Sequence, residues 1–287
     1  MTMDDRITQA WARLGAIAQA EHADSRIAPG SLTRAWLPGQ VVPTAIVLLH
    51  GITNAPPQYA LLGDQLAARG HAVIVPRMPY HGFRDRLTDA IAALRAPEMQ
   101  AAALDAVAIA ALSGRRVVVA GISVGAVLAG WLAARTAIDT AIAIAPFCGI
   151  RELAGGANDA LGCALRALPN RFAWWDPRRK EAQPPPHGYP RFATRTLGES
   201  LAISTALVDP GARVHARRAF VVLNARDPIV NNPFARRRFA RLVRFGVDVV
   251  PVTLDGLPEI HDIIEPEIPE ARTDLVYPRL IELIERP

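Results

Sequence analysis

Residues 116–131 read Arg-Val-Val-Val-Ala-Gly-Ile-Ser-Val-Gly-Ala-Val-Leu-Ala-Gly-Trp. The β-branched residues 117–119 lie among small apolar residues, which is the composition of a strand buried on both faces. The alanine-rich segment that follows, up to Arg135, has the character of a helix. Between them, Gly121 and Gly125 flank Ser123 in a turn so tight that the serine must take a strained backbone conformation. This pattern predicts a serine hydroxyl held clear of the sheet at the positive end of a helix.

A membrane span is the competing interpretation of this stretch. Residues 117–134 carry no charge, and their number reaches the roughly 18 residues that suggest a transmembrane helix. Gly121, Ser123, Gly125 and Gly130 interrupt the run, however, and its β-branched first part suits a strand. The stretch is therefore predicted to be strand, turn and helix, and we expect no integral membrane segment.

At these residues the chain resembles the α/β-hydrolase superfamily, specifically its carboxylesterase and monoacylglycerol-lipase-like branch. The resemblance rests on His50-Gly51 after an apolar run, on the Gly-x-Ser-x-Gly turn, and on an aspartate followed by a histidine further on. It spans the chain from about Val42 to the C-terminus. It implies an α/β fold with a doubly wound, mostly parallel sheet, and a mainly helical cap inserted after the sixth strand.

The spacing of apolar segments supports this fold class independently. Strands are expected at residues 31–36, 44–49, 72–76, 117–120, 140–146, 219–223 and 247–254. Helices are expected at residues 8–19, 57–70, 84–94, 96–112, 233–245 and 271–285. Pro278 is expected to kink or divide the last helix. Strands that alternate with helices at this spacing indicate a mostly parallel sheet covered on both faces.

The alternation lapses between residues 149 and 216. No strand is evident there, and helical character is limited to residues 153–168 and 196–207. About 65 residues is too long for an ordinary loop, and the resemblance places a cap over the active site at this point. We therefore divide the chain into a core, 1–148 and 217–287, and a cap or lid, 149–216; a surface excursion with no binding role is the alternative.

Three aromatic residues of the predicted cap are candidates for substrate binding. Phe172, Trp174 and Trp175 lie close together in the sequence. They are predicted to line an acyl pocket, and the alternative is that they hold the cap together.

The loop that begins at His50 and Gly51 is the expected first half of an oxyanion hole. The glycine allows the backbone to turn its N–H groups toward the serine. By resemblance, the donors are the backbone N–H groups of Ile52 and Val124. His50 is expected to orient this loop, and His81 to be structural, because a triad histidine follows the serine in this fold.

An aspartate and a histidine complete the candidate site. Asp227 follows the strand at 219–223, at the end of the sheet where catalytic groups collect. His261 is the only histidine after it, so Ser123, Asp227 and His261 occur in the required order. Asp248 and Asp255 are weaker candidates for the acid because they belong to the next strand. Asp262, next to the histidine, is expected to be solvated.

These residues suggest nucleophilic catalysis. His261 would take the proton of Ser123 and later return it to the leaving group, while Asp227 would orient the imidazole. A serine at this turn indicates acyl transfer, and we expect hydrolysis of small-molecule carboxylic esters with small to medium acyl chains, monoglycerides among them. A serine peptidase, amidase or acyltransferase on the same scaffold is the first alternative, and a non-catalytic binding protein of hydrolase type is the next.

The composition bears on partners and location. Half of the 287 residues are hydrophobic and 21% are charged, which excludes a disordered chain. The net charge of +5 comes almost entirely from arginine, with Lys180 as the only lysine, and we attribute it to genome composition. No nucleic-acid-binding motif accompanies the basic cluster at 236–244, so no nucleic-acid partner is expected. Salt-dependent binding to nucleic acid or to an anionic membrane surface is a further alternative.

The remaining expectations concern cofactors and compartment. The histidines are scattered and no glycine-rich nucleotide loop is present, so we expect no metal and no cofactor. Residues 1–6 carry neither the basic start nor the apolar run of a signal peptide, which favours a cytoplasmic protein. Cys148 and Cys163 are then expected to be free thiols. The oligomeric state stays open.

Overall fold

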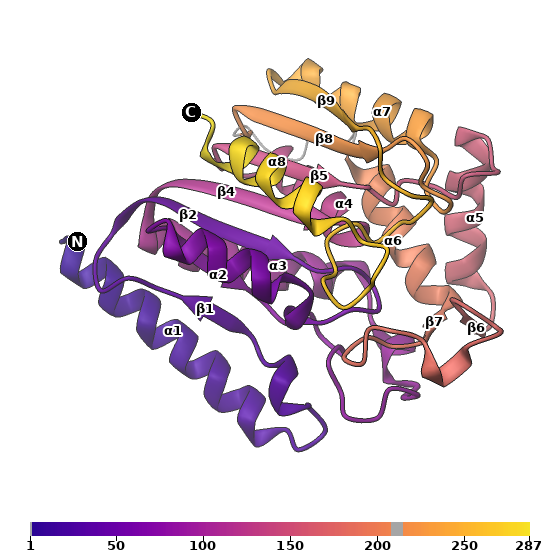
Figure 1. The fold of residues 1–287 in the computed structure, drawn as a ribbon, viewed down its shortest axis with the longest axis horizontal. Helices are drawn as coiled ribbons and strands as arrows, with labels where there is room; N and C mark the ends of the chain where they lie inside the picture. Colours follow the sequence, from indigo (N-terminus) through magenta and orange to yellow (C-terminus); the bar gives the residue numbers. More distant parts are fainter. Residues whose placement is uncertain (1, 208–214) are drawn as a thin grey trace.

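The computed structural model describes residues 2–207 and 215–287. Its centre is a sheet of seven strands in the order β1-β3-β2-β4-β5-β8-β9 (Figure 1). Only β1 runs antiparallel to its neighbour, β3; the other neighbouring pairs are parallel. The predicted doubly wound, mostly parallel sheet is therefore confirmed.

The sheet strands are β1 (Arg34–Trp36), β2 (Val42–Leu49), β3 (Ala72–Val75), β4 (Gly114–Ile122), β5 (Thr140–Ile144), β8 (Arg218–Asn224) and β9 (Asp248–Leu254). The α-helices are α1 (Met3–Ala23), α2 (Ala60–Ala68), α3 (Ala96–Ser113), α4 (Val124–Ala133), α5 (Gly155–Ala167), α6 (Thr194–Ala206), α7 (Asn232–Ala240) and α8 (Thr273–Glu285). A separate pair of short antiparallel strands, β6 (Phe172–Trp174) and β7 (Arg191–Ala193), lies between α5 and α6.

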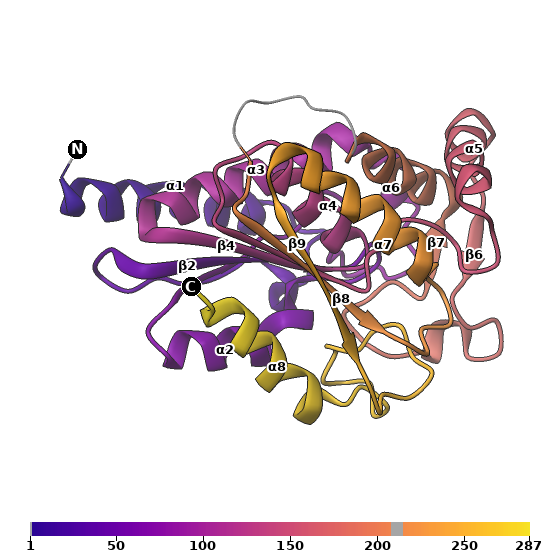
Figure 2. The same cartoon turned by 90° about the horizontal axis from the view of Figure 1, so that it is seen from above.

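Helices cover both faces of the sheet, so successive side chains of the central strands enter different cores. Helices α1, α3, α4 and α7 lie on one face, and α2 and α8 lie on the other (Figure 2). Val47 and Leu49 of β2 belong to the core on the first face, whereas Ile46 and Leu48 belong to the core on the second. Burial on both faces explains why the central strands read as continuous apolar runs.

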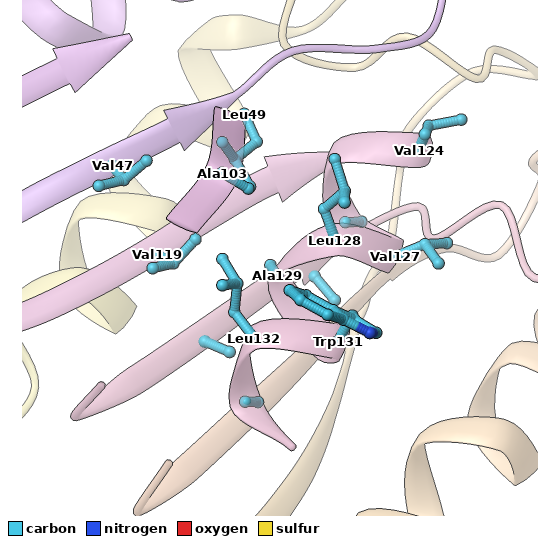
Figure 3. Close-up of a cluster of buried hydrophobic side chains, with 14 of the residues drawn as sticks. Val47, Leu49, Ala103, Val119, Val124, Val127, Leu128, Ala129, Trp131 and Leu132 are labelled. Carbon is cyan, nitrogen blue, oxygen red and sulfur yellow. The ribbon is translucent and has the colours of Figure 1, made fainter. Parts of the chain in front are cut away.

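Helix α4 is the most completely buried helix of the first core. All ten of its residues are buried, and Leu128, Leu132 and Trp131 pack among side chains of β2, β4 and α3 (Figure 3). The uncharged sequence that raised the question of a membrane span therefore serves this core. No helix within residues 2–207 and 215–287 combines the length and apolar character that crossing a bilayer requires.

The predicted helix at 84–94 was wrong. Only residues 90–93 form a short 3-10 helix, and turns precede it. The side chains of Asp85 and Thr88 accept hydrogen bonds from the backbone N–H groups of Leu87 and Ala90, at 2.9 and 3.2 Å. Such local bonds compete with the hydrogen bonds of a helix.

Pro278 does not divide the last helix. Helix α8 continues through it from Thr273 to Glu285. Six residues of α8 are buried against the sheet, among them Tyr277 and Leu280. This packing outweighs the one backbone hydrogen bond that proline cannot make.

Residues 149–216 lie between β5 and β8, as the insertion was expected to, but they contain β6 and β7, which were missed. Each of these strands has only three residues, too few for an alternation to be seen in the sequence. The insertion was expected after the sixth strand. In the described part of the chain it follows the fifth, β5, because only one strand, β1, comes before β2. Helix α6 packs in the main core, where Leu201 and Ile203 are buried with α4. The division into core and cap stays a prediction.

Both cysteines are free thiols. Cys148 is buried just beyond β5, and burial raises the pKa of its thiol to about 12. Cys163 is exposed on α5.

Candidate active site

Ser123 lies at the turn between β4 and α4, in the strained conformation that the sequence predicted. Its φ and ψ angles are 57° and −112°, and its backbone N–H donates to the carbonyl of Ile144 on the next strand at 2.9 Å. A Cβ atom at Gly121 would lie 2.2 Å from the carbonyl oxygen of Gly125, and one at Gly125 would lie 2.0 Å from that of Leu49. Both positions therefore require glycine, and the strain is maintained by close packing around the turn.

In the loop after β2, hydrogen bonds occupy the backbone groups on either side of the predicted oxyanion donor, the N–H of Ile52. The N–H of Gly51 donates to Oε1 of Gln58 at 2.9 Å, the carbonyl of Ile52 contacts His81, and the carbonyl of Thr53 accepts from the N–H of Tyr189 at 2.7 Å. Within the described residues, the N–H of Ile52 has no hydrogen-bond acceptor. The N–H of Val124, at the first position of α4, has no acceptor within its helix.

His50 and His81 support this loop, as predicted. Nε2 of His50 accepts from the N–H of Met78 at 3.1 Å, so Nδ1 carries the proton and donates to the carbonyl of Gly51 at 2.9 Å. Nε2 of His81 lies 2.5 Å from the carbonyl oxygen of Ile52. Burial lowers the pKa of both imidazoles, so they are neutral at physiological pH. Their hydrogen bonds agree with the structural role expected of both.

Asp227 and His261 form the expected pair at the carboxyl ends of the strands. Nδ1 of His261 lies 2.8 Å from Oδ2 of Asp227. The other oxygen of Asp227 accepts from the N–H groups of Ile229 and Val230 at 2.8 and 3.0 Å. Asp227 is 2% exposed, so these bonds determine the orientation of its carboxylate and, through it, that of the imidazole.

The two members of this pair stabilise each other's charged forms. Burial lowers the pKa of His261, but the charge and hydrogen bond of Asp227 and the charge of Asp262 outweigh burial and raise this pKa above 6.5. Burial raises the pKa of Asp227, but the charge and hydrogen bond of His261 and two backbone bonds outweigh burial and lower that pKa below 3.8. The negative charges of Asp227 and Asp262 therefore stabilise the imidazolium that forms when His261 accepts a proton as a base.

Ser123 and His261 line one cavity of about 270 Å³. No hydrogen bond joins their side chains in the described part of the chain; such bonds are often long in proteins without bound substrate. Most of the lining is apolar and includes Ile122, Ile229 and Ile260. The cavity can hold a small organic molecule with a carbonyl group near the serine.

The opposite wall of the cavity comes from the segment between β5 and β8. Trp175 and residues 183–185, 188 and 189 line it. Nε1 of Trp175 donates to Oγ1 of Thr53 at 2.8 Å, and the guanidinium of Arg86 donates to the carbonyls of residues 181, 183, 185 and 188. This wall is therefore attached to the loop that carries the Ile52 amide.

Of the three aromatic residues predicted to bind substrate, the structure places only Trp175 at the cavity. Phe172 and Trp174 are not among its lining residues. Phe172 packs with a smaller core near Tyr189 and lies under the guanidinium of Arg191, 4.3 Å from it.

Asp262 is a functional candidate that the sequence analysis missed, because it was expected to be solvated. Instead it lines the cavity, and its Oδ2 accepts from Nε2 of Gln58 at 2.6 Å. Gln58 also lines the cavity. No local pattern identifies such a contact, since the two residues lie 204 positions apart.

Within residues 2–207 and 215–287, no group of three or more histidine, cysteine, aspartate or glutamate side chains is arranged to hold a metal ion. The site chemistry that the described residues can supply is a serine hydroxyl, an imidazole oriented by a carboxylate, and free backbone N–H groups.

Comparison with known structures agrees with this architecture. One similar structure comes from work on LipS and LipT, two metagenome-derived lipolytic enzymes (17% identity, TM-score 0.65, covering 90% of this chain and 98% of that chain). Others are a monoglyceride lipase from Saccharomyces cerevisiae (12%, 0.58, 88% and 90%) and an enol-lactonase from Burkholderia xenovorans (17%, 0.52, 88% and 96%). At these identities the similarity establishes the fold alone. No curated protein sequence matched the chain.

The sequence of residues 46–259 matches the model of the alpha/beta hydrolase family. This range covers most of the chain, including the turn at Ser123 and the aspartate at 227, and ends two residues before His261. Together with the sheet order, the match shows that the chain belongs to the alpha/beta hydrolase family.

Proposed function

We propose that the protein is a serine hydrolase that cleaves carboxylic esters with small to medium acyl groups through an acyl-enzyme on Ser123. The observation that carries the proposal is the shared cavity: a strained serine and an imidazole bonded to a buried aspartate line the same 270 Å³ space. The mainly apolar lining suits an acyl chain.

In the first step, Nε2 of His261 takes the proton of the Ser123 hydroxyl as the oxygen attacks the ester carbonyl. Asp227 stabilises the imidazolium that forms. The N–H groups of Ile52 and Val124 bind the developing oxyanion, and each such donor typically contributes about 3–4 kcal/mol to the transition state.

In the second step, His261 returns its proton to the leaving alcohol, and the C–O bond of the substrate breaks. A water molecule then gives a proton to His261 and attacks the acyl-enzyme. The C–O bond to Ser123 breaks, His261 returns the proton to the serine oxygen, and the carboxylic acid leaves. The segment 149–216 acts as a cap in this proposal, because its residues form one wall of the cavity.

The test is turnover of p-nitrophenyl esters of increasing acyl length by the wild type and by Ser123→Ala. We expect kcat to fall by about three orders of magnitude or more in the variant, with an optimum at short to medium chains in the wild type. Equal and slow hydrolysis by both proteins across the series would contradict the proposal.

A further inference from the structure

The charge of the cavity differs in sign from that of the whole chain. The chain has a net charge of +5, yet no arginine or lysine of residues 2–207 and 215–287 lines the cavity, and Asp262 is its only carboxylate. Any anionic group of a substrate would therefore meet a negative charge and no fixed positive charge.

The carboxylate of Asp262 is held in this position by two amide side chains. Its Oδ2 accepts from Gln58 at 2.6 Å and from Nδ2 of Asn54 at 3.3 Å. Gln58 is 1% exposed, and its own orientation is determined because its Oε1 accepts from the N–H of Gly51. No arginine or lysine in the described ranges pairs with Asp262, so neutral groups hold the carboxylate at the cavity and leave its charge there.

A second carboxylate strengthens the negative potential behind Asp262. Glu265 is fully buried. Its Oε2 lies 3.3 Å from Nδ2 of Asn54, the same amide that Asp262 contacts, and 3.0 Å from Nε2 of His187. Like charges that share one amide donor add their potentials at the cavity.

We infer that Asp262 determines the charge selectivity of the site: the cavity takes uncharged esters and rejects esters of the same size that carry a carboxylate. The inference rests on the proposed function and names its substrate class. Rejection follows because a substrate anion would lie beside the like charge of Asp262 in a mainly apolar cavity that no arginine or lysine of the described residues lines.

The test compares two methyl esters of equal shape, the neutral methyl 4-methylpentanoate and the anionic methyl hemisuccinate, in which a carboxylate replaces the isopropyl group. The measured quantity is the ratio of kcat/KM for the neutral ester to that for the anionic ester. At pH 8 we expect a ratio of about 100 or more for the wild type and a decrease of about tenfold in Asp262→Asn. An unchanged ratio in this variant would overturn the inference.

Glu270→Gln is the matched control. Glu270 is an exposed carboxylate eight positions from Asp262 that does not line the cavity. Its removal changes the net charge by the same amount, so the ratio should stay within twofold of the wild type. If both variants lower the ratio equally, long-range charge and not Asp262 is responsible.

A second measurement needs no substitution. Burial and the charge of Glu265 raise the pKa of Asp262 to about 6, against the opposing effect of His261. Tyr59 and Tyr277 also face this carboxylate, but burial raises the pKa of both phenols, so they stay uncharged below pH 8.

The wild-type ratio should therefore increase between pH 5.5 and pH 8, as Asp262 loses its proton. The hemisuccinate stays anionic in this range, since a free carboxyl group has a pKa near 4.3. Ionisation of His261 affects both esters alike and cancels in the ratio. A ratio that is constant with pH would contradict the inference even if Asp262→Asn failed to fold.

If neither ester is cleaved, the proposed function has failed, and the inference is tested by binding alone. Calorimetric titration of Ser123→Ala with 4-methylpentanamide and with succinamate, a pair of the same shapes, should then show tighter binding of the neutral amide. Equal affinity for the two would reject the inference separately.

Discussion

The two walls of the cavity are built in different ways. On the core wall, Ser123 and Asp227 follow the strands β4 and β8, so the sheet determines their relative positions. His261, in the loop after β9, is held by its bond to Asp227. On the opposite wall, Trp175 and residues 183–189 belong to no element of the sheet. They are held by hydrogen bonds to Thr53 and Arg86 instead. Ser123, Asp227 and His261 should therefore control turnover, whereas side chains on the opposite wall should affect substrate binding more than turnover.

The largest expected effect that separates the two walls is that of Asp227→Asn. The asparagine keeps the shape of the side chain but no longer selects the imidazole tautomer or stabilises the imidazolium. We expect kcat on p-nitrophenyl butyrate to fall by about 10³–10⁴-fold with little change in KM. Asp255→Asn, which alters an exposed carboxylate after β9, should keep wild-type turnover; a comparable loss there would mean that Asp227 has no special role.

The pH dependence of turnover tests the role of His261 as the base on the core wall. Because Asp227 and Asp262 raise the pKa of His261, the imidazole gains its proton already at a pH above 6.5. Only the neutral imidazole acts as a base, so activity should rise with pH and fall about tenfold per unit below this pKa. The midpoint of the acid limb, measured as kcat/KM for a neutral ester, should lie above 6.5 in the wild type. A midpoint below 6.5 would contradict the assignment of His261 as the base.

A smaller effect is expected on the opposite wall. Trp175→Phe removes the hydrogen bond to Thr53 and part of the cavity surface. KM should rise about three- to tenfold while kcat changes less than threefold, since this contact is made equally in the ground state and the transition state. Trp174→Phe is the matched control, because the neighbouring tryptophan lies outside the cavity lining. A larger effect on kcat than on KM in Trp175→Phe would remove the distinction between the two walls.

The sequence predicted the core wall better than the opposite wall, for physical reasons. The turn at Ser123 is a local structure, and its strand, its two glycines and its helix are contiguous in the chain. Asp227 and His261 were identified from chain order, because strands of a parallel sheet all end at the same edge. The roles of these residues stay proposals until turnover is measured.

The opposite wall, and Asp262 beside His261, depend on contacts between distant residues. Asp262 contacts Gln58 across 204 positions, and nothing near either residue indicates the other. Phe172, Trp174 and Trp175 are so close together in the sequence that composition cannot tell which of them lines the cavity and which packs elsewhere. The pairing of the three-residue strand β6 with β7, and the contact of Phe172 with Arg191, determine this. The helix expected at 84–94 failed similarly, because hydrophobic periodicity does not register side chains that bond to their own backbone.

The different environments of the two cysteines allow a fluorescent label to be attached to α5 alone. Cys163 is exposed on this helix, whereas Cys148 is buried with a pKa of about 12. A maleimide dye added to the folded protein at neutral pH will therefore label α5 at one position and leave the thiol beside β5 intact. Fluorescence from that dye will report in real time whether α5 shifts when an acyl group occupies the cavity.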